Sequence, residues 1–326
     1  MNRMRATLAA AVLAAAALVS TSAFAQEWPS RPVRIINPFP GAGATDTLAR
    51  ILADHFTTVF KQSFYVEARG GAGGQIALKA VADAPQDTYT LIISTVSLLA
   101  VQPTANPKLG FDPHHDIANI AYVAGTPLVF CVNPSFGVKT PDEFVAHARN
   151  SAKPLTYSSS GVGTMGHLVA ESFAQKVNVK FEHVPYKGAA QGLTDLAGGH
   201  IVFSAQTVSS SAGLIQGGAL RAVVVSSNAR LPDYPELPTF KEAGYPEMTA
   251  NTWFALSGAA SLPSDLVQKI NREVVRALSQ PQVQQTLRTQ GFTNEDMSPA
   301  EFKALIAAET ARWKPVIEAA GLVGQQ

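Results

Sequence analysis

The chain has 326 residues, of which 46% are hydrophobic and 15% charged, and its formal net charge is +1. A near-neutral chain without a basic run gives no reason to expect nucleic acid as a partner. The single cysteine, Cys131, excludes an internal disulfide, so the fold must depend on apolar cores, and the chain is long enough to build two of them.

The first 25 residues have the three parts of a secretory signal peptide. Arg3 and Arg5 form the positive start, residues 6–19 the apolar core, and Ala23-Phe24-Ala25 the small-residue cleavage site. The apolar core is about 14 residues long, whereas a membrane-spanning helix needs about 20. We therefore predict export to the periplasm, with cleavage after Ala25.

Short apolar runs alternate with amphipathic segments through most of the remaining chain. Strands are predicted at residues 33–39, 64–67, 90–95, 121–132, 155–159, 181–186, 201–205, 220–226 and 253–257. Helices are predicted between them at residues 45–61, 74–84, 141–151, 163–177 and 188–197. This alternation favours an α/β fold with parallel sheets that are covered on both faces. Three further helices, at residues 263–279, 281–289 and 299–320, follow with little strand signal and are expected to cover one lobe.

Two proline-rich segments, residues 103–113 and 231–246, interrupt the alternation and are expected to be surface connectors. A lobe between them would be inserted into the first lobe, so the chain would cross between the lobes twice. We predict one lobe from residues 26–125 and 250–326, and a second lobe from residues 126–249. Ligands of two-lobed proteins bind in the cleft between the lobes.

Residues 33–50 have the pattern of a strand, a glycine-rich loop and a helix. Gly41 and Gly43 allow backbone angles and close approaches that a Cβ would block, while Thr45 and Asp46 suit the first turn of a helix. The unpaired N–H groups and the dipole of a helix N-terminus can bind a small anion. A dinucleotide site is disfavoured, since Asp46 replaces the third glycine of that fingerprint. A well-capped turn without a ligand remains the alternative.

A second loop of the same kind follows the strand at residues 155–159. Its serine hydroxyls and Thr164 are uncharged donors, which suit a carboxylate, although a plain polar turn has the same composition. A third polar segment begins with Gln206 and Thr207, which either line the cleft or cap the next helix. Two such loops, one in each lobe, can face each other across a cleft.

Catalytic machinery is not expected from this sequence. The Gly-x-Ser-x-Gly motif of serine hydrolases is absent. The seven histidines show no spacing with cysteine or acidic residues that is typical of a metal site, and no cofactor is expected.

Several motifs resemble those of the periplasmic solute-binding proteins of tripartite tricarboxylate transporters, the Bug receptor family. The matching segments occur in order along nearly the whole chain, and include Trp28-Pro29, Pro38-Phe39-Pro40-Gly41, Gly71-Ala72-Gly73-Gly74, Tyr157-Ser158-Ser159, Val184-Pro185-Tyr186-Lys187-Gly188 and Leu237-Pro238-Thr239. Gln206 stands where the family often has aspartate, and this exchange should relax any preference for ligands that carry an ammonium group.

The resemblance implies a two-lobed, Venus-flytrap fold of the type II kind, with the C-terminal helices on the first lobe. It implies capture of an aliphatic di- or tricarboxylate or an aromatic carboxylate, and delivery to inner-membrane permease subunits without chemistry. A monomer is expected. A receptor that feeds a two-component system and an exported hydrolase remain the alternatives. The predicted ligand-binding residues are Phe39, Gly41, Ala42, Gly43, Ala44, Thr45, Asp46, Ser158, Ser159, Ser160, Gly163, Thr164, His167, Gln206 and Thr207.

Overall fold

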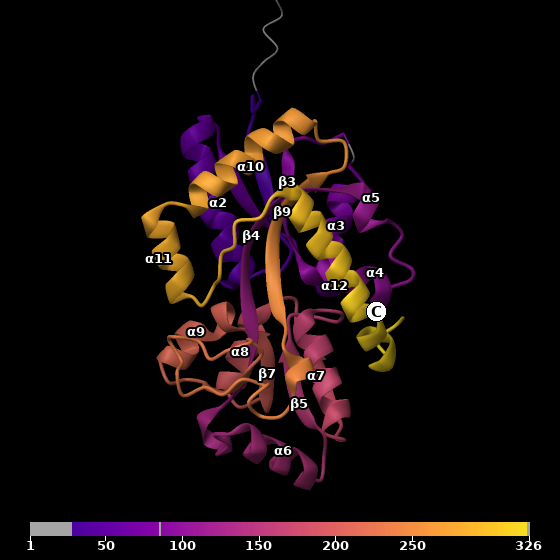
Figure 1. The fold of residues 1–326 in the computed structure, drawn as a ribbon, viewed down its shortest axis with the longest axis vertical. Helices are drawn as coiled ribbons and strands as arrows, with labels where there is room; N and C mark the ends of the chain where they lie inside the picture. The colour runs from indigo at the N-terminus through magenta and orange to yellow at the C-terminus, as the bar shows by residue number, and fades with distance from the viewer. Residues whose placement is uncertain (1–27, 85, 325–326) are drawn as a thin grey trace, which may run out of the picture.

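The computed structural model describes residues 28–84 and 86–324, which form two lobes stacked along the long axis of the molecule (Figure 1). The predicted signal peptide at residues 1–25 lies outside the described residues. Each strand and helix predicted above is present, with ends that differ by a few residues.

The first lobe contains β1 (Val33–Asn37), β2 (Phe64–Ala68), β3 (Thr90–Thr95) and β9 (Asn251–Ala259), with helices α2 (Ala44–Phe60), α3 (Gln75–Ala82), α4 (Gln102–Ala105), α5 (Pro113–Asp116), α10 (Ser264–Leu278), α11 (Pro281–Thr289) and α12 (Pro299–Ala319). The second lobe contains β5 (Leu155–Ser159), β6 (Phe181–Pro185), β7 (Phe203–Thr207) and β8 (Arg221–Val225), with helices α6 (Pro141–Asn150), α7 (Met165–Lys176), α8 (Ala189–Ala197) and α9 (Val208–Gln216). The long strand β4 (Ile117–Val132) belongs to both lobes.

The described strands form one mixed sheet in the order β2-β1-β3-β9-β4-β7-β5-β6, with β8 paired to β4. β1 is parallel to β2 and β3, and β5 is parallel to β6 and β7. The prediction of parallel sheets is wrong for β4 and β9, whose pairings are all antiparallel. The reason is topological: β4 carries the chain into the second lobe and β9 carries it back, so these neighbours run in opposite directions.

β4 exchanges its partners where the chain crosses between the lobes. It pairs with β9 as far as Pro127, opposite Asn251, and with β7 from Leu128, opposite Thr207. The predicted lobe limits, 125/126 and 249/250, fall beside this exchange and stay a prediction. The segment 231–246 is not a simple surface connector, since its Phe240 is completely buried and contacts the ring of Phe130 in the second lobe.

The helices that cover the sheet owe their positions to apolar side chains at helical spacing. In α10, Leu266, Ile270 and Val274 are buried, and their spacing of four residues places them on one face of the helix. This face packs in one core cluster with Leu52 and Phe56 of α2. Burying such a side chain contributes about 1.5–3 kcal/mol, so this packing holds α2 in place relative to α10 and the sheet.

The C-terminal helix α12 reaches beyond the first lobe. It packs on the π-helical segment Ser97–Val101 and on α4, and it also contacts α7 of the second lobe, where Gln175 Nε2 donates to the carbonyl oxygen of Ala319 at 3.0 Å. Figure 1 shows α12 beside both lobes, opposite the side that carries α2, α9 and α11. No helix that the structure describes has both the length and the apolar character needed to cross a membrane.

Candidate functional site

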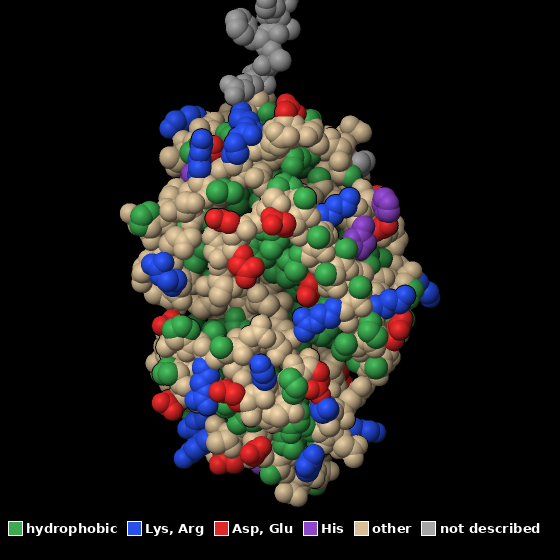
Figure 2. Space-filling view, in the orientation of Figure 1, with side chains coloured by type: hydrophobic (Ala, Val, Ile, Leu, Met, Phe, Trp, Pro, Cys, Tyr) green, Lys and Arg blue, Asp and Glu red, His purple; other side chains and the backbone are tan. Residues whose placement is uncertain are grey.

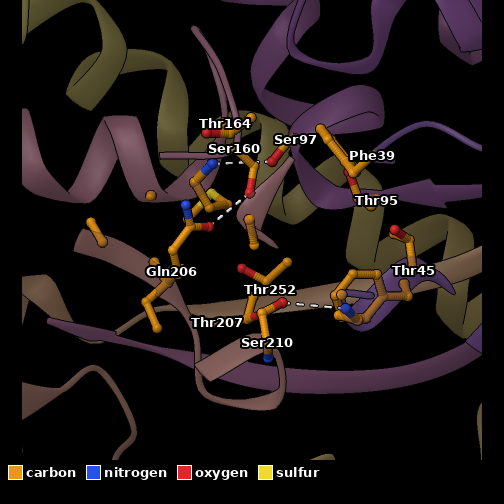
Figure 3. A pocket seen from close by; sticks show the side chains of 18 residues that line it. Phe39, Thr45, Thr95, Ser97, Ser160, Thr164, Gln206, Thr207, Ser210 and Thr252 are labelled. Carbon is orange, nitrogen blue, oxygen red and sulfur yellow. Dashed lines mark hydrogen bonds between the residues drawn. The ribbon is translucent and has the colours of Figure 1, made fainter. Parts of the chain in front are cut away.

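A cavity lies between the two lobes (Figure 3). Its 18 lining residues are Phe39, Gly43, Ala44, Thr45, Thr95, Ser97, Leu128, Ser160, Thr164, Met165, Gly166, Ala189, Ala205, Gln206, Thr207, Ser210, Thr252 and Phe254. All of them are apolar or carry neutral polar groups. The space open to the centres of water molecules is about 50 Å³. Since one water needs about 10–15 Å³ of such space, the cavity holds a ligand with the volume of roughly four waters.

Four helices begin at this cavity: α2, α7, α8 and α9. Ala44, Met165 and Ala189 are the first residues of α2, α7 and α8, and each lines the cavity. The N-cap residues of these three helices make no side-chain capping hydrogen bond. A helix N-terminus carries the equivalent of about half a positive charge, so four of them create a positive potential without any charged side chain. The cavity is therefore suited to an anion.

Tight packing places these helix ends. Gly41 has φ +100°, and a Cβ at this position would lie 2.8 Å from the Cβ of Ala190 in the other lobe. Gly166, in the first turn of α7, is packed so closely on β7 that a Cβ would collide with the carbonyl oxygen of Ala205. Both sites need glycine for close approach, and Gly41 also for its backbone conformation.

Two serines make reciprocal hydrogen bonds between the lobes. The hydroxyl oxygen of Ser210, in the second lobe, accepts from the N–H of Ala44 at 3.2 Å. The hydroxyl oxygen of Ser97, in the first lobe, accepts from the N–H of Met165 at 3.1 Å. We call these two hydrogen bonds the cross-lobe serine caps. Because each lobe supplies a partner for a helix N-terminus of the other, the lobes in this structure are closed on the cavity.

Eight of the predicted site residues line the cavity: Phe39, Gly43, Ala44, Thr45, Ser160, Thr164, Gln206 and Thr207. Two of their hydroxyl groups are already used as donors within the protein, since Thr45 donates to Asn37 Oδ1 and Thr164 donates to the carbonyl oxygen of Gly161, both at 2.7 Å. These two hydroxyls hold the loops in shape. Direct contact of any of these residues with a ligand stays a prediction.

Seven predicted site residues do not line the cavity: Gly41, Ala42, Asp46, Ser158, Ser159, Gly163 and His167. Ala42 and Asp46 lie instead on an outer groove between α2, α8 and α9, where Asp46 pairs with Arg50 at 2.7 Å. Ser158 and Ser159 are completely buried in β5.

His167 stabilises the loop before α7 by a hydrogen bond and does not line the cavity. Its Nδ1 accepts from the N–H of Gly163 at 3.1 Å, and its ring stacks on that of His183, with centroids 4.1 Å apart. His183 Nε2 lies 2.7 Å from Ser159 Oγ. Burial lowers the pKa of His167 to about 4 and, together with the neighbouring imidazole, that of His183 to about 3. Both imidazoles are therefore neutral at neutral pH.

Four polar residues that line the cavity are not among the predicted ligand-binding residues: Thr95, Ser97, Ser210 and Thr252. Ser210 belongs to the polar segment that begins at Gln206, for which the sequence leaves a position in the cleft as one of two alternatives. Ser97 follows the end of β3, and a polar residue just beyond a buried strand is a usable signal for a cleft position. Thr252 gives no such signal, because its position depends on the pairing of β9 with β4.

The described residues contain no group of three or more His, Cys, Asp or Glu side chains that could hold a metal ion. On the face shown in Figure 2, acidic and basic side chains are interspersed over both lobes. The polar groups that line the cavity are backbone groups, hydroxyls and one carboxamide.

Comparison with known proteins gives a consistent result. The protein BugT of Bordetella pertussis is 30% identical over 322 residues, which cover 98% of this chain and 99% of BugT. The adipate complex of Rpa4515 from Rhodopseudomonas palustris superposes with a TM-score of 0.86 at 33% identity, covering 90% of this chain and 99% of Rpa4515. MatC of the same organism, with bound malate, superposes with a TM-score of 0.85 at 27% identity, covering 89% of this chain and all of MatC.

The sequence model described as "Tripartite tricarboxylate transporter family receptor" matches residues 48–322. This match covers most of the chain and parts of both lobes, although Phe39, Gly43, Ala44 and Thr45 of the cavity lining precede it. The chain therefore belongs to the receptor family of the tripartite tricarboxylate transporters, a family of periplasmic solute-binding proteins.

Proposed function

We propose that this protein captures a small organic carboxylate in the interlobe cavity and delivers it to the membrane permease of a tripartite transporter. The observation that carries the proposal is the convergence of four helix N-termini on a cavity whose lining contains no charged side chain. Such a site stabilises an anion through dipoles and neutral donors. The adipate and malate complexes of Rpa4515 and MatC support this ligand class.

Binding without chemistry follows from the same geometry. Ser159 Oγ and His183 Nε2 are within hydrogen-bond distance, as in a hydrolase, but Ser159 is completely buried and does not line the cavity. A ligand in the cavity would not reach its hydroxyl group. The protein is therefore proposed to release its ligand unchanged to the permease, after export to the periplasm and removal of residues 1–25.

The proposal is tested by screening the purified protein, without residues 1–25, against mono-, di-, tri- and aromatic carboxylates in a thermal-shift assay. A ligand at a hundredfold excess over its dissociation constant stabilises the folded state by about 2.7 kcal/mol, which raises the Tm measurably. Mass spectrometry of the recovered ligand should show no turnover. Failure of the whole panel to stabilise the protein, or conversion of a bound acid to a product, would refute the proposal.

A further inference from the structure

A buried asparagine ends the strand that leads into the first loop of the cavity. Asn37 is the last residue of β1, is completely buried and does not itself line the cavity. Its Oδ1 accepts from the N–H of Phe39 at 3.0 Å and from the hydroxyl of Thr45 at 2.7 Å. Both partners line the cavity (Figure 3). One carboxamide therefore joins the two ends of the loop that carries Gly43 and Ala44.

The same carboxamide also contacts a charged group. Nδ2 of Asn37 donates to Oδ1 of Asp46 at 3.3 Å. The orientation of the carboxamide follows from its partners, because a backbone N–H can only donate and an ionised carboxylate can only accept. A flipped carboxamide would set its NH₂ group against the N–H of Phe39 and its oxygen against the Asp46 carboxylate. Asn37 thus uses both ends of its side chain within this loop.

The position of the Asp46 carboxylate matters for an anion in the cavity. Asp46 is the acidic residue in the first turn of α2, and its charge would repel an anionic ligand if it faced the cavity. It lies instead on the outer groove, where Asn37 Nδ2 and Arg50 Nε donate to it. The Arg50 side chain is 66% exposed, so water weakens its hold, whereas the Asn37 side chain is completely buried.

We infer that Asn37 is a positioning residue for the ligand: it fixes the N-terminus of α2 towards the cavity and holds the charge of Asp46 away from it. The inference rests on the proposed function, because the anion that it concerns is the one proposed for this cavity. Asparagine suits this position since its side chain donates, accepts and carries no charge. Leucine would make none of these hydrogen bonds, and aspartate would add a negative charge beside that of Asp46.

The exchange Asn37→Asp gives a test that depends on pH. Among the described residues, the charged side chains bonded to this cluster are those of Asp46 and Arg50. At pH 7.5 the introduced carboxylate would repel both Asp46 and the bound anion, so the affinity should fall about 10- to 100-fold. Burial beside Asp46 should raise the pKa of the introduced carboxyl group. Once protonated, at about pH 5, the group can again donate and accept, and the affinity should recover.

The probes are malate and adipate, the acids bound in the complexes of MatC and Rpa4515. Calorimetry with the full-length mature protein between pH 5 and pH 7.5 measures their affinities. The unchanged protein, measured at each pH, accounts for the titration of the acid itself and of other groups. The ratio of the two affinities, unchanged protein to variant, should therefore fall towards one as the pH is lowered.

The matched control is Asn133→Asp. Oδ1 of Asn133 accepts from the N–H of Ser135 at 2.9 Å, two residues further along the chain, just as Oδ1 of Asn37 accepts from that of Phe39. Asn133 directly follows β4 and does not line the cavity. The same change of chemistry at this position should leave the affinity for both acids and its pH dependence unaltered.

A second measurement needs no ligand. In ¹H–¹⁵N NMR spectra, the amide resonances of residues 38–46 should shift in both Asn37→Asp and Asn37→Leu at pH 7.5. At pH 5 they should return towards the positions of the unchanged protein in Asn37→Asp alone, because protonation cannot restore the hydrogen bonds in Asn37→Leu. The affinity of Asn37→Leu should likewise stay low at every pH.

The outcomes separate this inference from the function on which it rests. Full affinity of Asn37→Asp at pH 7.5, or a loss that is the same at pH 5, would overturn the inference. Loop amides that keep their positions in Asn37→Leu would overturn it as well. If Asn37→Leu does not fold, the pH series of Asn37→Asp decides. If the unchanged protein binds neither acid, the proposed function fails for these acids, and the spectra still decide whether Asn37 positions the loop.

Discussion

Replacing both Ser97 and Ser210 with alanine should shift the protein towards an open state. The two cross-lobe serine caps exist only when the lobes are closed, because each joins a hydroxyl of one lobe to a helix N–H of the other, at 3.1 and 3.2 Å. A neutral hydrogen bond contributes a net stabilisation of about 0.5–1.5 kcal/mol, so the loss of two costs about 1–3 kcal/mol. This corresponds to a decrease of about 5- to 150-fold in the ratio of closed to open molecules.

The experiment measures opening before ligand affinity, because both serines also line the cavity. Distances between spin labels on α6 and α10, one helix in each lobe, give the populations of closed and open molecules without any ligand. The single variants should each produce about half of the free-energy change, since the two serines contact different helices. An unchanged distance distribution in the double variant would refute the idea that these bonds hold the lobes together.

The remaining predictions concern packing and pH. Gly166→Ala should lower the Tm by several degrees, since the added Cβ would collide with the Ala205 carbonyl oxygen. The control Gly213→Ala, on α9, has no atom within 4 Å of the added Cβ and should leave the Tm unchanged or raise it. Equal Tm values for the two variants would contradict this packing argument. The pKa of His167 is lowered from 6.5 to about 4 and that of His183 to about 3, so the unfolded state binds more protons below pH 6.5. Above pH 6.5 both histidines are neutral in the folded and the unfolded state, so the free energy of unfolding does not depend on their protonation. As the pH falls from 6.5 towards 4, the free energy of unfolding decreases by about 1.4 kcal/mol per pH unit for each histidine. Urea unfolding at pH 7.5 and 4.5 should show this loss, and His167→Gln should make it smaller; the same pH dependence in the variant would exclude His167 as its source.

Most of the fold was predictable because its signals are local. Alternation of apolar runs with amphipathic segments located every strand of the sheet, and the three C-terminal helices were visible from their proline starts and apolar spacing. The direction of β4 and β9 was not predictable in this way. Both are continuous buried runs, and such a run looks the same whether its neighbours are parallel or antiparallel.

The site was predictable only as far as its loops. Glycine- and serine-rich turns before α2 and α7 identified where helix N-termini would lie, and Ala44 and Met165 do line the cavity. The direction of individual side chains depends on tertiary contacts, which have no local signal. His167 is turned to the N–H of Gly163 rather than to the cavity, and Thr252 reaches the cavity only through the register of β9.

The pairing of β4 with β9 and β7 limits how the protein can release a ligand. The strand β4 continues from the first lobe into the second, hydrogen-bonded to β9 up to Pro127 and to β7 from Leu128. Separation of the lobes must therefore bend this sheet near Pro127, because no flexible linker is available there to act as a hinge. α12 spans both lobes on one side and resists separation there. The mouth should therefore open on the opposite flank, between α2 and α9, and a bound solute would leave the protein on that side.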